Sequence, residues 1–203
     1  MNNSDSGFTP GELRKLRSLN HPHGIQSFLD SQPYHLADTA WSPRRVLQEN
    51  TSHCFEGALF AAAALRVNGY PPLVIDLEAE HDTDHVIAVF KDHGHWGAVA
   101  KSNYSGCQYR EPVYRSLREL AMSYFEDYFN LRRQRTLRTF SRPVNLARFD
   151  HLNWMTTDQP LWFVAEYLFT IRHFALLKAG MAGRLHRLND RSFRAGCLGR
   201  AAK

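Results

Sequence analysis

The chain has 203 residues, of which 43% are hydrophobic and 22% charged, and its net charge is +5; these values are typical of a globular domain, with or without a helical appendage, and exclude low-complexity chains. The longest apolar run, residues 57–65, ends at Arg66 and is far shorter than the roughly 20 residues that a membrane span needs. Because residues 1–7 also lack the basic and apolar regions of a signal peptide, we expect a cytoplasmic protein without a membrane partner.

The N-terminal part of the chain predicts a disordered tail followed by short helices. Residues 1–8 are polar and are expected to be disordered. The run from Thr9 to Glu12 contains a threonine cap, a proline at the first helical position and a glutamate three residues after the cap. This pattern predicts a helix over about residues 10–19, and two further helices are expected to begin near Pro22 and Pro43.

Residues 54–67 are expected to form the central helix of the fold. Alanine and leucine dominate this segment and favour a helix. Its apolar residues cover nearly the whole circumference, so the helix should be buried on most sides. Asn68 and Gly69 predict its end, because this pair is typical of a C-cap, and the prolines at 71 and 72 prevent continuation.

Three strands are expected after this helix, over residues 73–77, 85–90 and 96–101. The last two are separated by a turn at His93 and Gly94, which predicts a hairpin that pairs Asp92 with His95. A helix followed by antiparallel strands indicates an α+β fold, in which a central buried helix carrying a cysteine at its N-terminus packs on an antiparallel sheet. Extra helices are expected at both ends of the chain.

The second half of the sequence predicts further helices around a loop-rich stretch. Helices are expected over residues 116–129, 161–171 and about 179–198, with a short strand at 136–140. We therefore divide the chain into a disordered tail (1–8), an α+β domain (9–157) and a C-terminal helical cap packed on the same domain (158–203).

The positive charge gathers in two arginine clusters. They are Arg132, Arg133, Arg135, Arg138 and Arg142, followed by Arg184, Arg187, Arg191, Arg194 and Arg200. No nucleic-acid-binding motif accompanies them, so the sequence favours solvated surfaces over a nucleic-acid interface.

Cys54 and His85 are the candidate reactive residues. Cys54 follows a run of good N-cap residues, which places its sulfur at the start of the central helix, where the helix dipole favours a thiolate. Glu56 would oppose that effect if its carboxylate pointed at the sulfur. His85 opens a strand on the same face as Ile87 and suits a general base for a cysteine nucleophile. A buried structural cysteine and a surface histidine are the alternatives.

Four motifs together resemble the transglutaminase-like superfamily, and in particular its uncharacterised bacterial members. They are His53-Cys54-Phe55-Glu56-Gly57-Ala58, Asn68-Gly69-Tyr70-Pro71-Pro72, Asp84-His85-Val86 and Gly94-His95-Trp96. The resemblance covers roughly residues 50–105. It implies a papain-like cysteine fold with Cys54 as nucleophile and His85 as base. The implied reaction is hydrolysis or acyl transfer through a thioester, without a cofactor or a metal. The implied substrate is a peptide, a protein or a small amide or ester.

The third member of the family's catalytic triad, an aspartate, is replaced here by Ala100. Counting residues from the hairpin turn puts Ser102 opposite His85, and a bulge would put Asn103 there instead. We expect Asn103 to orient the histidine, with Ser102 as the substitute, because an amide oxygen accepts an imidazole N–H well. Gln48 and Trp41 are candidates for binding the substrate or its oxyanion.

Two other functions are compatible with the sequence. Without the triad aspartate, the domain would be a catalytically inactive binding or scaffold module, with an aromatic-rich helix as the partner surface. The histidines near Cys54, with His81 and His85 at a zinc-like spacing, also allow a zinc-binding protein. The zinc signal is weak, because no paired Cys-x-x-Cys motif is present. The three cysteines show no disulfide spacing and are expected to be reduced.

Overall fold

The computed structural model describes residues 7–201. Of the predicted disordered tail, residues 1–6 lie outside the described part. Phe8 differs from that prediction, since it is only 6% exposed and belongs to the hydrophobic core. No helix in the described part of the chain is long and apolar enough to cross a membrane.

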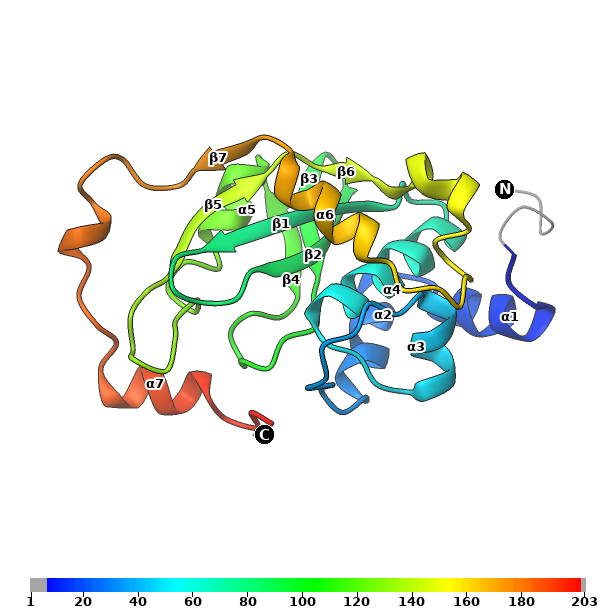
Figure 1. The fold of residues 1–203 in the computed structure, drawn as a ribbon, viewed down its shortest axis with the longest axis horizontal. Helices are drawn as coiled ribbons and strands as arrows, with labels where there is room; N and C mark the ends of the chain where they lie inside the picture. Colours follow the sequence, from blue (N-terminus) through cyan, green and yellow to red (C-terminus); the bar gives the residue numbers. More distant parts are fainter. Residues whose placement is uncertain (1–6, 202–203) are drawn as a thin grey trace.

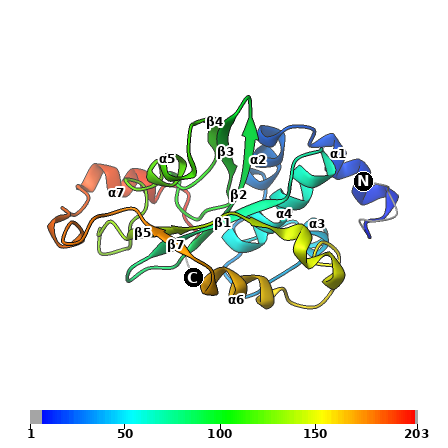
Figure 2. The ribbon, with the colours of Figure 1, turned by 90° about the horizontal axis from the view of Figure 1, so that it is seen from above.

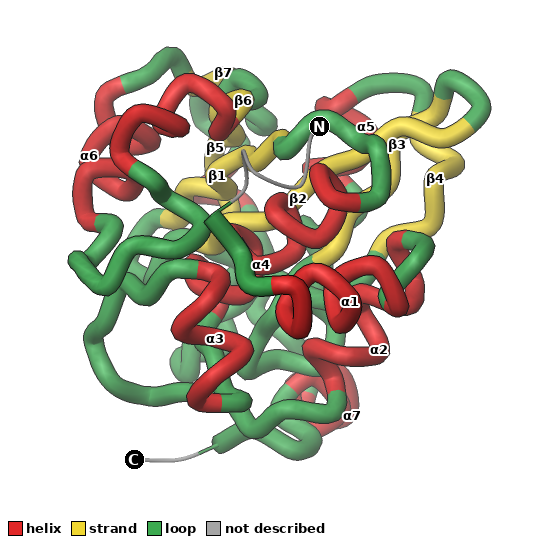
Figure 3. The backbone as a smooth tube through the Cα atoms, turned by 90° about the vertical axis from the view of Figure 1, so that its right-hand side faces the viewer, coloured by secondary structure: helices red, strands yellow, loops and turns green. Residues whose placement is uncertain are grey.

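Three short helices open the fold, and each begins with a proline in its first turn. They are α1 (Pro10–Ser18), α2 (Pro22–Asp30) and α3 (Pro43–Glu49). The predicted cap of α1 is present, because the Thr9 hydroxyl accepts from the Glu12 amide while the Glu12 carboxylate accepts from the Thr9 amide. All three helices pack against the central helix on the side away from the strands, as Figure 3 shows.

The central helix α4 (Cys54–Val67) begins at the candidate nucleophile. Every residue from Phe55 to Leu65 is buried, which confirms the predicted central buried helix. The helix stops where the sequence predicts, with the amide of Tyr70 bonded back to the Leu65 carbonyl at 2.9 Å and Gly69 at a positive φ of 91°.

The sheet is antiparallel throughout, which confirms the predicted α+β class. Its strands are β1 (Leu73–Ala79), β2 (His85–Asp92), β3 (His95–Val99), β4 (Arg110–Tyr114), β5 (Leu137–Ser141), β6 (Val144–Asn145) and β7 (His173–Ala175). Their order across the sheet is β4-β3-β2-β1-β5-β7, and β6 pairs with β1 off this path. The hairpin register is the predicted one, with Asp92 opposite His95.

The third strand is shorter than predicted, because it ends at Val99 rather than at Lys101. The side-chain amide of Gln26, on α2, accepts from the Ala100 N–H at 3.0 Å and donates to the Ala100 carbonyl at 2.9 Å. The ammonium of Lys101 donates to the Leu29 and Gln32 carbonyls at the end of α2, both at 2.6 Å. These bonds turn the chain away from the sheet before it reaches the position opposite His85.

The three helices predicted for the second half are shorter in the structure, and the last of them is divided in two. The observed helices are α5 (Leu117–Met122), α6 (Trp162–Thr170), the 3-10 helix η3 (Ala182–Arg184) and α7 (Asp190–Gly196). A further 3-10 helix, η2 (Leu146–Leu152), forms within the predicted loop-rich stretch. Helix α5 ends early because the Ser123 carbonyl accepts from the Arg110 guanidinium instead of from the next turn of a helix. The segment expected to be a purely helical cap also contributes a strand, since β7 pairs with β5.

The sheet separates two hydrophobic cores. Helices α1 to α4 and α6 cover one face, and α5 with the aromatic residues after it covers the other. Figure 1 shows α4 crossing below β1 and β2, and Figure 2 shows α5 and α6 on opposite sides of the strands. The start of α4 and the start of β2 therefore lie at the same end of the sheet, which is where the candidate site lies.

Candidate active site

Cys54 is the first residue of α4, and its sulfur is held by several neighbours. The thiol donates to the Asp84 carbonyl over 3.9 Å. Burial raises the pKa of the Cys54 thiol, although hydrogen bonds from the Val86 backbone and the Tyr34 side chain act in the opposite direction. The sulfur is therefore a neutral thiol at rest, and a base is needed to activate it.

His85 opens β2 and is 6% exposed. Its ring makes edge contacts with Tyr124 and Tyr128, at centroid distances of 6.5 and 6.4 Å. Nε2 lies 3.2 Å from the Cys107 carbonyl, which can only accept, so the proton resides on Nε2 and Nδ1 is the free acceptor. Burial and the nearby Arg110 charge lower the pKa of His85 to about 4, against the opposite effect of the Cys107 carbonyl.

Cys54 and His85 line one cavity of about 610 Å³. No hydrogen bond joins the Cys54 sulfur to the His85 ring within residues 7–201, so the two groups face the same space as a neutral thiol and a neutral imidazole. The rest of the lining includes Tyr34, Asn103 and Arg200.

The residues expected to orient His85 line this cavity but bind elsewhere. The Asn103 side chain accepts from the Ala201 amide at 2.7 Å and donates to the Ala201 carbonyl at 3.0 Å. The Ser102 hydroxyl accepts from the Tyr104 amide at 3.0 Å. In this structure the acceptor that fixes the His85 ring is the main-chain carbonyl of Cys107.

The two residues suggested for substrate or oxyanion binding lie outside the cavity lining. Gln48 is exposed on α3. Trp41 stacks on His35, with ring centroids 4.3 Å apart, and its amide donates to a Glu56 oxygen at 3.0 Å. The Glu56 carboxylate also accepts from the Thr39 hydroxyl at 2.5 Å, so it holds the loop before α3.

Tyr34 is a neighbour of Cys54 that could not be predicted from the sequence. It lines the same cavity as Cys54, and its side chain interacts with both the backbone and the thiol of that residue. Burial, and then the nearby Cys54, raise the pKa of Tyr34, so the phenol stays neutral and keeps its donor. A parallel bridge to Ser52 anchors it, and this long-range contact has no local sequence signal.

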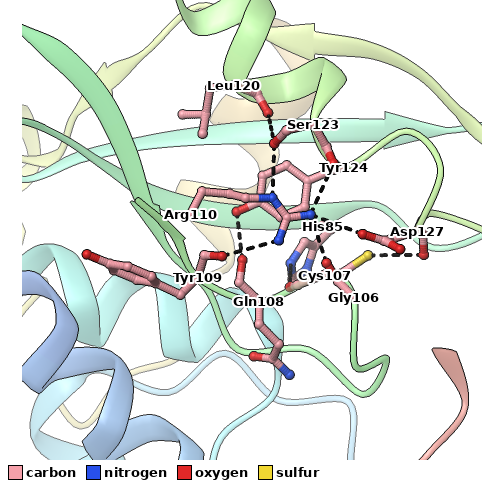
Figure 4. Close-up of polar contacts among 10 residues, drawn as sticks. All are labelled: His85, Gly106, Cys107, Gln108, Tyr109, Arg110, Leu120, Ser123, Tyr124 and Asp127. Carbon is pink, nitrogen blue, oxygen red and sulfur yellow. Dashed lines mark hydrogen bonds and ion pairs between the residues drawn. The ribbon is translucent and has the colours of Figure 1, made fainter. Parts of the chain in front are cut away.

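Arg110 holds the loop that carries the Cys107 carbonyl. Its guanidinium donates to the Gly106 carbonyl at 2.9 Å and the Ser123 carbonyl at 3.1 Å, and pairs with Asp127 at 3.3 Å. The guanidinium also lies 4.1 Å from the centre of the Tyr124 ring. Figure 4 shows these contacts around the His85 ring. The loop is thus fixed on the core side of the sheet, and with it the orientation of the imidazole.

A second cavity, of about 420 Å³, lies on the other side of Cys54 and reaches α6. Its lining includes Asp76, Asp84 and the exposed rings of Trp162 and Phe169. Asp76 pairs with His173 at 3.2 Å. Burial and the nearby Asp84 raise the pKa of Asp76 to about 6, although His173 acts in the opposite direction.

The pKa of His85 predicts a pH dependence of folding stability. The unfolded histidine takes up its proton near pH 6.5, whereas the folded one stays neutral down to about pH 4. The stability that neutral His85 contributes is therefore complete above pH 6.5 and is lost as the pH falls to about 4, by about 3 kcal/mol in total. The difference in unfolding free energy between wild type and His85→Gln, from urea titrations across this range, should follow that curve.

Asp76 acts in the opposite sense and serves as the control. Its folded pKa is raised from 3.8 to about 6, so the folded protein gains stability from this group as the pH falls below 6. Asp76→Asn should make the acid loss of stability steeper, while His85→Gln should make it shallower. The same slope for both variants would contradict the assigned protonation states.

Metal ligands do not converge on this site. Within residues 7–201, no three His, Cys, Asp or Glu side chains are arranged to hold a metal ion. His81, which the sequence analysis paired with His85 at a zinc-like spacing, is 79% exposed, whereas His85 is buried. All three cysteines are free thiols in this structure.

Comparison with known proteins finds distant structural similarity and no matching family. No protein-family model matches the sequence, and no curated protein matches it. Two solved structures of Legionella pneumophila LapG are similar, each with a TM-score of 0.35. The EGTA-treated form is 17% identical to this chain, and the match covers 49% of this chain. This chain spans 66% of the length of that form, just under two thirds. The other structure is 16% identical to this chain, and the match covers 59% of this chain and 91% of the LapG chain.

Proposed function

We propose that the chain is a transglutaminase-like cysteine hydrolase or acyltransferase that acts on an amide or ester carbonyl. The observation that carries this proposal is the arrangement of Cys54 and His85 around one cavity. A thiol at a helix N-terminus faces that cavity, together with an imidazole whose Nε2 proton is fixed on the Cys107 carbonyl. This bond leaves Nδ1 free to accept the proton from the sulfur.

The reaction would proceed in two steps. The Nδ1 atom of His85 takes the thiol proton as the Cys54 sulfur bonds to the substrate carbonyl carbon. The carbonyl bond then re-forms, the leaving amine or alcohol takes that proton from the imidazole, and a thioester remains on Cys54. Water or an amine then attacks the thioester, again with His85 as the base, and the thiol is restored.

Tyr34 and the start of α4 provide the donors that such a reaction needs. The first amide groups of a helix have no partner within the helix, and the Tyr34 hydroxyl lies beside the Cys54 amide. Donors at this position would stabilise the negative oxygen of the tetrahedral intermediate. We therefore assign Tyr34 and the Cys54 N–H as the oxyanion donors, in place of Gln48 and Trp41.

The test is the formation of an acyl-enzyme. Wild-type protein mixed with p-nitrophenyl acetate should acquire one acetyl group on Cys54, found by mass spectrometry of the peptide that contains it, and hydroxylamine should remove that group. Cys54→Ser serves as the background control. Acetylation spread equally over Cys54, Cys107 and Cys197 would contradict an activated nucleophile and favour a binding module.

A further inference from the structure

The C-terminal segment, residues 189–201, lies along the loop that follows β3. Figure 1 shows α7 and the residues after it running below this loop. Ser105 donates its amide to the Gly196 carbonyl at 3.0 Å and its hydroxyl to the Ala195 carbonyl at 2.7 Å. The Asn103 amide group forms the two bonds with Ala201 described above.

These contacts recognise main chain rather than side chains. In all four hydrogen bonds the segment contributes only amide and carbonyl groups, whereas the loop contributes two side chains and one amide. A side-chain amide that pairs with both the N–H and the C=O of one residue fits any peptide, because every residue except proline carries that pair. The chemical class that this loop binds is therefore a peptide main chain.

An aromatic surface anchors the segment beside these bonds. The Phe193 ring lies 5.6 Å from Phe129, which in turn lies 5.2 Å from Tyr104. Gly196 packs so closely on Phe129 that an added Cβ would lie 2.5 Å from the ring. The Arg133 guanidinium lies 5.0 Å from the centre of the Phe193 ring, so this anchor positions the segment, while Leu198 beyond it is 78% exposed.

The segment reaches the candidate active site. Arg200 lines the same cavity as Cys54 and His85, and so do Asn103 and Tyr104. Its guanidinium lies 5.6 Å from the centre of the Tyr104 ring, whereas its Nε atom is buried without a hydrogen-bond partner. Through Arg200 the segment thus reaches the wall of the cavity that holds the Cys54 sulfur.

We propose that Asn103, Ser105 and Phe129 form a binding strip for a peptide main chain, which residues 195–201 fill in the resting protein. A substrate peptide displaces this segment and is led along the strip to Cys54. The claim that the strip leads a substrate to Cys54 rests on the proposed function, whereas the existence of the strip does not. This assignment also gives Asn103 a role as a substrate-binding residue instead of the orienting partner of His85.

The test measures binding in the absence of any reaction. The probe is a fluorescein-labelled peptide with the sequence of residues 189–201 and serine at the position of Cys197, and the protein carries Cys54→Ala. Fluorescence anisotropy should show about 10-fold tighter binding when Phe193→Ala releases the internal segment. Adding Asn103→Ala to that protein should weaken binding by about 10-fold or more, because two hydrogen bonds are lost.

Leu198→Ala is the matched control, because this exposed side chain lies on the same segment and should change nothing. Hydrogen exchange at residues 103–105 should also rise in the Phe193→Ala protein.

Equal peptide affinity in the Phe193→Ala protein with and without Asn103→Ala would overturn the proposal. Peptide binding without acyl-enzyme formation on intact Cys54 would disprove the proposed function and leave the strip in place. Acyl-enzyme formation without peptide binding would disprove the binding strip and leave the proposed function in place.

Discussion

Replacing His85 by glutamine is expected to slow the acylation of Cys54 by roughly 10²- to 10⁴-fold, the usual contribution of a general base. The effect should be large because burial raises the pKa of the Cys54 thiol, so little thiolate is present without a base. In many cysteine enzymes a low thiol pKa supplies the nucleophile directly, whereas here the proton must be removed during the attack. The measurement is the rate of p-nitrophenol release in a single turnover, followed from pH 5 to pH 9.

Two comparisons separate this role from a structural one. The rate for wild type should be independent of pH well above the lowered pKa of His85, about 4, whereas the residual rate of His85→Gln should rise with pH as hydroxide generates thiolate. Cys107→Ser should keep most of the wild-type rate, because the group that orients His85 is the carbonyl of this residue and not its sulfur. An unchanged rate in His85→Gln would show that His85 is not the base.

Replacing Arg110 by methionine is expected to destabilise the fold by about 2 to 4 kcal/mol and to release the His85 ring. The variant leaves the Gly106 and Ser123 carbonyls without their donor and leaves Asp127 without its partner. It also removes a positive charge that lowers the pKa of His85, so that pKa should rise from about 4. Urea unfolding gives the stability, and ¹⁵N NMR of the imidazole gives both the pKa and the position of the ring proton.

Arg110→Lys is the conservative comparison. A lysine keeps the charge but not the several N–H donors of the guanidinium. It should therefore keep the pKa of His85 low while losing much of the stability, whereas methionine changes both. If the Nε2 proton and the pKa of His85 stay the same in Arg110→Met, the loop is fixed by other contacts and Arg110 has no positioning role.

The central helix and the hairpin could be predicted because their signals are local. Alanine and leucine favour a helix from Cys54, and Asn68 with Gly69 ends it within the same short stretch. The turn at Gly94 fixes the pairing of Asp92 with His95, and each further pair follows from it. These signals also place Cys54 at the start of its helix and His85 at the start of its strand.

The length of the later helices and the partners of His85 could not be predicted in this way. Helix α5 ends where Arg110 takes the Ser123 carbonyl, an interaction between residues that are 13 positions apart. Counting from the hairpin turn would put Ser102 opposite His85, but the β2–β3 pairing ends at Ala88 and Val99, where Gln26 binds the next residue, Ala100. A main-chain carbonyl such as that of Cys107 can orient a histidine from any residue type, so it leaves no mark in the sequence.

The α+β architecture and the order of Cys54 and His85 along the chain follow from the sequence, because hydrophobic pattern, caps and turns act over a few residues. The surroundings of these two residues depend on the packing of the whole chain. This packing brought Tyr34 to the Cys54 sulfur, the Cys107 carbonyl to the His85 ring and Ala201 to Asn103, a pair 98 positions apart. Such contacts depend on the packing of loops against a completed core, and no local pattern encodes them.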